Sequence, residues 1–74
     1  METQQLVKMA NQIGAFFEDM PDRSQAHAEI ANHLKKFWEP RMRKAIVEKM
    51  DGGEATELSP VVREAIDTHR GLLS

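Results

Sequence analysis

The clearest helical pattern in the chain is residues 6–17, LVKMANQIGAFF. At 100° per residue the apolar side chains of this stretch share about a third of the helical wheel. They are Leu6, Met9, Ala10, Ile13 and Phe17, with Met20 continuing the stripe. Phe16 lies at the edge of the stripe and Val7 lies outside it. This pattern predicts an amphipathic helix over residues 3–19.

Turn residues divide the rest of the chain into further helices. The breaks are Pro21-Asp22, Pro40, Asp51-Gly52-Gly53 and Ser59-Pro60. Between them apolar residues recur at helical spacing, which predicts helices over residues 23–38, 41–51 and 60–70. No stretch alternates with period two, so no sheet is expected. We therefore expect one all-α domain, residues 1–74, built as a small bundle of about four short helices. Gly71 should end the last helix and leave residues 72–74 as a loose tail.

The helix ends carry capping residues. Asp22 is a candidate N-cap for the second helix, with Ser24 as a competitor. Pro40 and Pro60 suit first helical positions, and Ser59 suits the N-cap before Pro60. Gly52 or Gly53 is expected to end the third helix in the left-handed conformation.

The size and composition of the chain favour a partner. It has 74 residues and no cysteine, so disulfides and thiolate metal sites are excluded. Small domains of this size usually need a staple or a second chain to supplement their core. No apolar run approaches the roughly 18 residues of a membrane span. Residues 1–5 lack the basic and apolar segments of a signal peptide, so we expect a cytoplasmic protein with no membrane partner.

The residues that could carry chemistry do not form a known motif. His27 and His33 are six positions apart on one predicted helix, about 120° around it, and do not converge. Gly52-Gly53 lacks the frame of a phosphate-binding loop. His69 lies among apolar residues and is expected to pack in the core. We expect no catalytic, cofactor-binding or metal-binding residue in this chain, and no enzyme activity of its own.

The four aromatic residues come as two adjacent pairs, Phe16-Phe17 and Phe37-Trp38. Neighbouring helical residues point about 100° apart, so one narrow stripe does not easily bury both members of a pair. Phe17 and Phe37 lie near the centres of their stripes and are expected in the core. Phe16 and Trp38 are left at the flanks. A wide contact within the bundle would explain them, and so would a partner.

A basic segment surrounds the second aromatic pair. Residues 35–49 hold six Lys and Arg against two Glu, a net charge of +4, within a chain of net charge −2. Trp, Met and Arg are enriched in protein interfaces, and Trp38, Arg41, Met42, Arg43 and Met50 supply that mixture. We therefore expect an interface here, with Trp38→Ala costing at least about 2 kcal/mol in partner binding. A solvated helix face is the alternative, and a sequence pI of 5.9 disfavours nucleic acid.

Three blocks resemble the delta subunit of bacterial NAD-dependent, molybdenum- or tungsten-containing formate dehydrogenases. They are LVKMANQI at residues 6–13 with Phe16-Phe17 following, IANHLKKFWEPRMR at residues 30–43, and LSPVV at residues 58–62. The middle block is the most specific. The resemblance implies a non-catalytic subunit, with an interface role for Asn11, Phe37, Trp38, Pro40, Arg41, Met42 and Arg43. Phe16 joins this interface set as a flanking aromatic.

The resemblance also implies the partners. They are the catalytic alpha subunit first, together with beta and gamma subunits, in a complex that carries bis-molybdopterin guanine dinucleotide, iron–sulfur clusters and FMN. This chain would hold none of these cofactors. Three functions remain open: a permanent accessory subunit, a transient chaperone for cofactor insertion into the large subunit, or an unrelated regulatory or nucleic-acid-binding helical protein.

Overall fold

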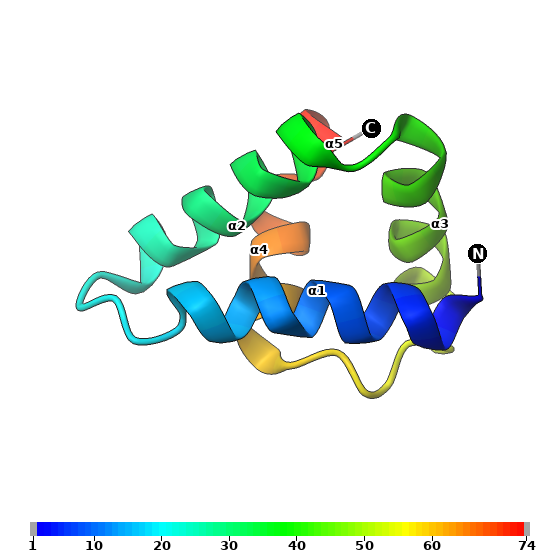
Figure 1. Cartoon of the computed structure of the whole chain (residues 1–74), viewed down its shortest axis with the longest axis horizontal. Coiled ribbons are helices and arrows are strands. Elements are labelled where there is room, and N and C mark those ends of the chain that lie inside the picture. The colour runs from blue at the N-terminus through cyan, green and yellow to red at the C-terminus, as the bar shows by residue number, and fades with distance from the viewer. Residues whose placement is uncertain (1, 74) are drawn as a thin grey trace.

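The computed structural model describes residues 2–73, and these residues form helices and loops without a strand. The helices are α1 (Thr3–Phe17), α2 (Arg23–Phe37), α3 (Pro40–Asp51), α4 (Pro60–Thr68) and α5 (Arg70–Leu73). The all-α class predicted from the sequence is confirmed. In Figure 1, α1 runs along one side, α2 and α3 stand over it, and α4 lies between them. The most extensive packing joins α2 to α4.

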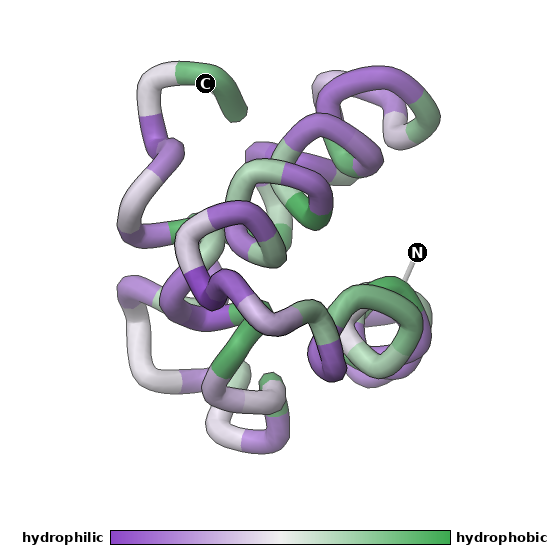
Figure 2. The backbone as a smooth tube through the Cα atoms, turned by 90° about the vertical axis from the view of Figure 1, so that its left-hand side faces the viewer, coloured by the Kyte–Doolittle hydropathy of each residue, from purple (hydrophilic) through white to green (hydrophobic). Residues whose placement is uncertain are grey.

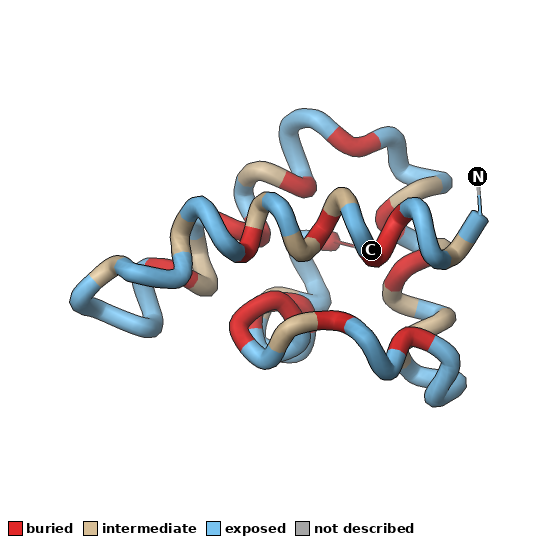
Figure 3. The backbone as a smooth tube through the Cα atoms, turned by 60° about the horizontal axis from the view of Figure 1, so that its bottom comes forward, coloured by how far each residue is buried: buried red, intermediate tan, exposed pale blue. Residues whose placement is uncertain are grey.

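Each longer helix turns one apolar face towards the centre of the molecule. Figure 2 shows hydrophobic and hydrophilic segments alternating along the helical turns, and Figure 3 shows buried positions spaced along each helix. The largest fully buried side chains come from all five helices: Leu6, Ile30, Leu34, Ile46, Val61, Val62, Ile66 and Leu73. The core is therefore a shared one, to which every helix contributes.

The ends of the helices follow the capping chemistry in most places. The Asp22 carboxylate accepts hydrogen bonds from the backbone N–H groups of Ser24 and Gln25, at 2.9 and 3.4 Å. Asp22 rather than Ser24 is thus the N-cap of α2. Pro40 and Pro60 begin α3 and α4 as predicted. Gly53 has a φ of 75°, the left-handed conformation expected after α3.

Three helices end earlier than predicted, and α3 begins at Pro40 rather than at residue 41. α1 ends at Phe17 rather than residue 19, α2 at Phe37 rather than 38, and α4 at Thr68 rather than 70. The predicted loose tail is wrong for Leu72 and Leu73, since both belong to α5 and Leu73 is buried in the core. Ser74 lies outside the described residues. Gly71 lies inside this short helix and does not end α4.

Helix α1 approaches α4 closely at a glycine. A Cβ atom on Gly14 would lie 2.5 Å from Cγ2 of Val62 and 3.2 Å from Cγ1 of Val61. Only a residue without a side chain fits this contact unless α4 moves. Val7 lies two helical turns before Gly14 on the same face of α1. It is therefore buried although it lies outside the predicted stripe. Two sides of α1 are covered, one by α2 and α3 and one by α4 with the loop before it.

Candidate functional site

The second aromatic pair lies the opposite way round from the prediction. Trp38 is 6% exposed and belongs to the core cluster, whereas Phe37 is 71% exposed. The reason is the end of α2. Phe37 is the last helical residue, and Trp38 adopts an extended conformation with φ −88° and ψ 141°. The wheel that placed Trp38 at the flank no longer applies beyond Phe37, and the changed backbone direction carries the indole inwards.

Arg43 is also a core residue. It is 7% exposed, and its Nη1 donates hydrogen bonds to the carbonyl oxygens of Trp38, at 2.6 Å, and Lys35, at 3.2 Å. Helix C-termini leave carbonyl groups without an intrahelical partner, and a guanidinium can satisfy them. Arg43 on α3 therefore holds the end of α2 in place. Arg41, two positions earlier, is fully at the surface and pairs with Glu39 at 3.5 Å.

Asn11 likewise serves the fold. Its Nδ2 donates to the carbonyl oxygen of Glu57 at 2.9 Å, and its Oδ1 accepts from the backbone N–H of Ser59 at 2.8 Å. These bonds tie the loop before α4 to α1. Ser59 stands at the predicted N-cap position, but its hydroxyl makes no capping bond, and its Oγ is buried without a hydrogen-bond partner. The Asn11 amide thus fixes the start of α4 from another helix.

Replacing Asn11 tests this tether. Asn11→Ala removes the donor to the exposed Glu57 carbonyl and the acceptor from the partly buried Ser59 N–H, and we expect a loss of about 1–3 kcal/mol in the free energy of unfolding. Urea denaturation followed by circular dichroism measures it. Asn32→Ala is the matched control, because Asn32 is an exposed helical asparagine and should change stability by less than about 0.5 kcal/mol. Equal effects for the two variants would contradict the tether.

The exposed aromatic residues gather on one face of the molecule. Phe16 is 80% exposed, and its ring meets that of Phe17 edge-on, with centroids 4.9 Å apart. Phe17 lies 6.5 Å from His33, and His33 lies 4.7 Å from Phe37. We call these four residues the aromatic patch. Large exposed apolar patches mark interaction sites in soluble proteins. Phe17 is half-buried, so its predicted place in the core is only partly correct.

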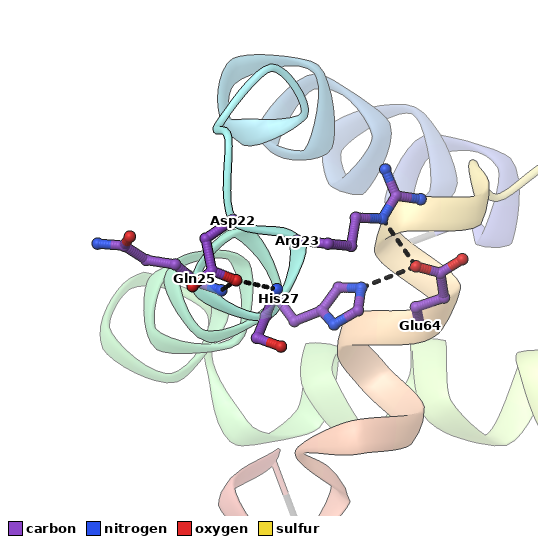
Figure 4. A network of polar contacts seen from close by, with 6 residues as sticks. Asp22, Arg23, Gln25, His27 and Glu64 are labelled. Atoms are coloured by element: carbon purple, nitrogen blue, oxygen red, sulfur yellow. Dashed lines mark hydrogen bonds and ion pairs between the residues drawn. The ribbon is translucent and has the colours of Figure 1, made fainter.

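A polar cluster on another part of the surface links α2 to α4 (Figure 4). One oxygen of the Glu64 carboxylate accepts from Nε of Arg23 at 2.9 Å and lies 2.8 Å from Nε2 of His27. These two hydrogen bonds, that from Arg23 being the stronger influence, hold the pKa of Glu64 below its ordinary value of 4.5. A similar clamp joins α5 to α3, where Arg70 contacts both carboxylate oxygens of Asp51, at 2.9 and 2.7 Å, and lowers the pKa of Asp51.

The lowered pKa of Glu64 predicts a pH dependence. A carboxylate with a lower pKa in the folded state stabilises the fold above its unfolded pKa, and this contribution is lost as the pH falls through the folded pKa. Glu64→Gln should therefore lower the melting temperature near neutral pH. The difference from wild type should shrink as the pH falls below about 4.5. A difference that stays constant over this range would show that the ion pairs do not contribute.

In residues 2–73 no three His, Asp or Glu side chains come together as a group that could hold a metal ion. Within the same range no helix has both the length and the apolar character needed to cross a bilayer. Some of the predicted interface residues lie at the surface, and others hold the fold together. Phe16, Phe37, Pro40 and Arg41 are exposed and Met42 is half-buried, while Asn11, Trp38 and Arg43 hold the fold together.

A small helical domain with a complete core and a separate exposed aromatic patch is typical of a protein that binds another chain. Comparison with known families identifies the family of this chain. Residues 5–66 match the family model of the NADH-dependent formate dehydrogenase delta subunit, FdsD, so the chain belongs to this family. Neither the curated proteins nor the solved structures contain a match to the chain. Membership of this family argues against a protein unrelated to formate dehydrogenase.

Proposed function

We propose that this chain is a non-catalytic accessory subunit that assembles or stabilises an NAD-dependent formate dehydrogenase complex through protein–protein contacts. Its first partner is the catalytic alpha subunit, in a cytoplasmic complex with beta and gamma subunits. The family to which the chain belongs supports this proposal. The observation that carries it is the aromatic patch, because Phe16 and Phe37 are exposed while Trp38 is buried in the core.

The redox cofactors of such a complex belong to the partner subunits in this proposal. Iron–sulfur clusters are held by cysteine thiolates, and the chain has no cysteine. FMN and bis-molybdopterin guanine dinucleotide carry phosphate groups, which proteins commonly bind with glycine-rich loops at helix N-termini. The Gly52-Gly53 pair lies at the C-terminal end of α3 instead. We therefore assign these groups to the partner subunits.

Five of the predicted interface residues remain available to a partner. Phe16, Phe37, Pro40 and Arg41 are exposed, and Met42 is half-buried beside them. Pro40 begins α3 two residues after the buried Trp38, and so fixes the bend between Phe37 at the end of α2 and Arg41 at the start of α3. We assign the other three residues, Asn11, Trp38 and Arg43, to the stability of the subunit rather than to direct contact.

Deletion of the chain from its native host tests the proposal. An assembly or stabilising role predicts less assembled formate dehydrogenase, with unchanged NAD reduction per assembled complex. Quantitative mass spectrometry of the complex and its specific activity measure the two quantities separately. Normal amounts of complex with a lower activity per complex would contradict the assembly or stabilising role. Re-expression of the chain should restore the amount of complex.

A further inference from the structure

We propose that the aromatic patch and the groove beside it receive one apolar, acidic helix of a formate dehydrogenase subunit. The inference rests on the proposed function and adds the surface and the chemistry of its partner. Three observations carry it: the order of the aromatic rings, the groove that adjoins them, and the charges at one end of the patch.

The aromatic patch forms a continuous row across two helices. Phe16 and Phe17 come from the last turn of α1, and His33 and Phe37 come from the last two turns of α2. The ring centroids follow one another at 4.9, 6.5 and 4.7 Å. Such separations lie in the range at which aromatic rings contact one another. The patch is therefore a preformed apolar surface, which lowers the entropic cost of binding.

A groove of about 350 Å³ runs beside this row. Its apolar lining consists of Met9, Ile13, Phe16 and Phe17 from α1 and of Trp38, which follows α2. His33 and Gln12 supply polar atoms at the rim. A groove of this volume accommodates a few apolar side chains, which is what one face of an amphipathic helix presents at positions i, i+3 and i+4. A single helix thus fits both the size and the lining of the groove.

The charges around Phe37 select an acidic occupant. Residues 35–44 place four exposed cations, Lys35, Lys36, Arg41 and Lys44, against the single exposed carboxylate Glu39, a net charge of +3. Arg41 is paired with Glu39, while the three lysines make no ion pair within residues 2–73. A partner with carboxylates would neutralise them and bind faster through electrostatic steering. A two-fold contact through this patch would instead bring two such cationic ends into one interface.

The binding experiment uses the full chain and formate dehydrogenase purified from a host that lacks it. Phe16→Ser with Phe37→Ser should weaken binding at least about tenfold, since exposed aromatic residues are frequent hot spots. Leu72→Ser is the matched control, because Leu72 is an exposed apolar residue on α5 and should leave binding unchanged. Circular dichroism confirms that each variant is folded.

Charge is tested in the same assay. Changing Lys35, Lys36 and Lys44 to Gln should slow association and flatten its dependence on salt. Lys8→Gln is the control, because Lys8 is an exposed lysine that lines a different groove and makes no ion pair among the described residues. Equal salt dependence for the triple variant and the wild type would overturn the choice of an acidic partner.

A photo-crosslinking benzoylphenylalanine in place of Phe37 identifies the occupant in the assembled complex. We expect crosslinks to an apolar segment of another subunit with Asp or Glu within two helical turns. Crosslinks to a second copy of this chain, or to a basic segment, would contradict the proposal. If the Phe16/Phe37 double variant binds normally, the surface is wrongly assigned while the accessory role stands. If the wild-type chain does not bind at all, the proposed function fails.

Discussion

Trp38→Ala is expected to destabilise the fold by about 3–5 kcal/mol, the usual cost of truncating a large buried aromatic side chain. Trp38 is 6% exposed and packs in the core cluster where α2 ends and α3 begins. Its removal leaves a cavity between these helices that the short Glu39-Pro40 connection cannot close. Domains of this size have little stability to spare, so the variant is expected to be largely unfolded on its own.

Phe37→Ala is the matched control for Trp38→Ala. The two residues are adjacent aromatics, but Phe37 is exposed, so its truncation should change stability by less than about 1 kcal/mol. Urea denaturation followed by far-ultraviolet circular dichroism measures both variants, since Trp38 is the only tryptophan and fluorescence is lost with it. Trp38→Phe should retain part of the stability. A stable Trp38→Ala with a destabilised Phe37→Ala would place the aromatic pair the other way round.

Arg43→Ala is expected to cost about 3 kcal/mol, because it removes charged hydrogen bonds to two carbonyl groups at the end of α2. One of these carbonyls, that of Trp38, is buried with Arg43 and has no access to water as a substitute. The variant should loosen the α2–α3 connection and lower the midpoint of unfolding.

Arg41→Ala is the control for Arg43→Ala. Arg41 is exposed and makes one surface ion pair with Glu39, which is worth at most about 1 kcal/mol. Similar losses from the two variants would contradict the structural role of Arg43. Arg43→Lys adds a second comparison. A lysine ammonium has fewer donors than the planar guanidinium and does not present them in a fixed fork. We therefore expect Arg43→Lys to be more stable than Arg43→Ala and less stable than the wild type.

The elements of the fold are predictable from the sequence, and the orientation of several side chains is not. Helical periodicity, Asp22 as a cap, and Pro40 and Pro60 at the first helical positions all depend on neighbours in the chain, and the structure confirms them. The burial of the Trp38 side chain depends on the residue at which α2 ends. A helix that ends one residue earlier than predicted reverses which aromatic of the pair is buried.

Other errors come from contacts between distant residues. Asn11 binds backbone groups of Glu57 and Ser59, which are 46 and 48 positions away, and no local pattern reveals such a pairing. Leu73 is buried because α5 folds back against α2, although Gly71 looks like a helix end. His69 is half-buried, so its predicted place in the core is only partly correct. The sequence alone thus does not separate the exposed residues of the predicted interface from the buried ones that hold the fold together.

This separation changes how mutations in the family motif are to be interpreted. Trp38 and Arg43 stand in the most specific block of the resemblance, yet both are buried in the isolated subunit. Variants at these positions should lose the complex because the subunit unfolds. The binding effect predicted for Trp38→Ala from the sequence is therefore replaced by an effect on folding. Phe16 and Phe37 are the residues whose loss should weaken binding while the subunit stays folded.

We propose that this chain stays in the mature enzyme as a structural subunit. Native mass spectrometry of the active formate dehydrogenase complex from the native host tests it most directly, since each copy adds 8.4 kDa. We expect the chain in a fixed ratio to the alpha subunit in the fraction that reduces NAD. Its presence only with an inactive alpha subunit, and its absence from the active complex, would contradict the claim and indicate a transient chaperone.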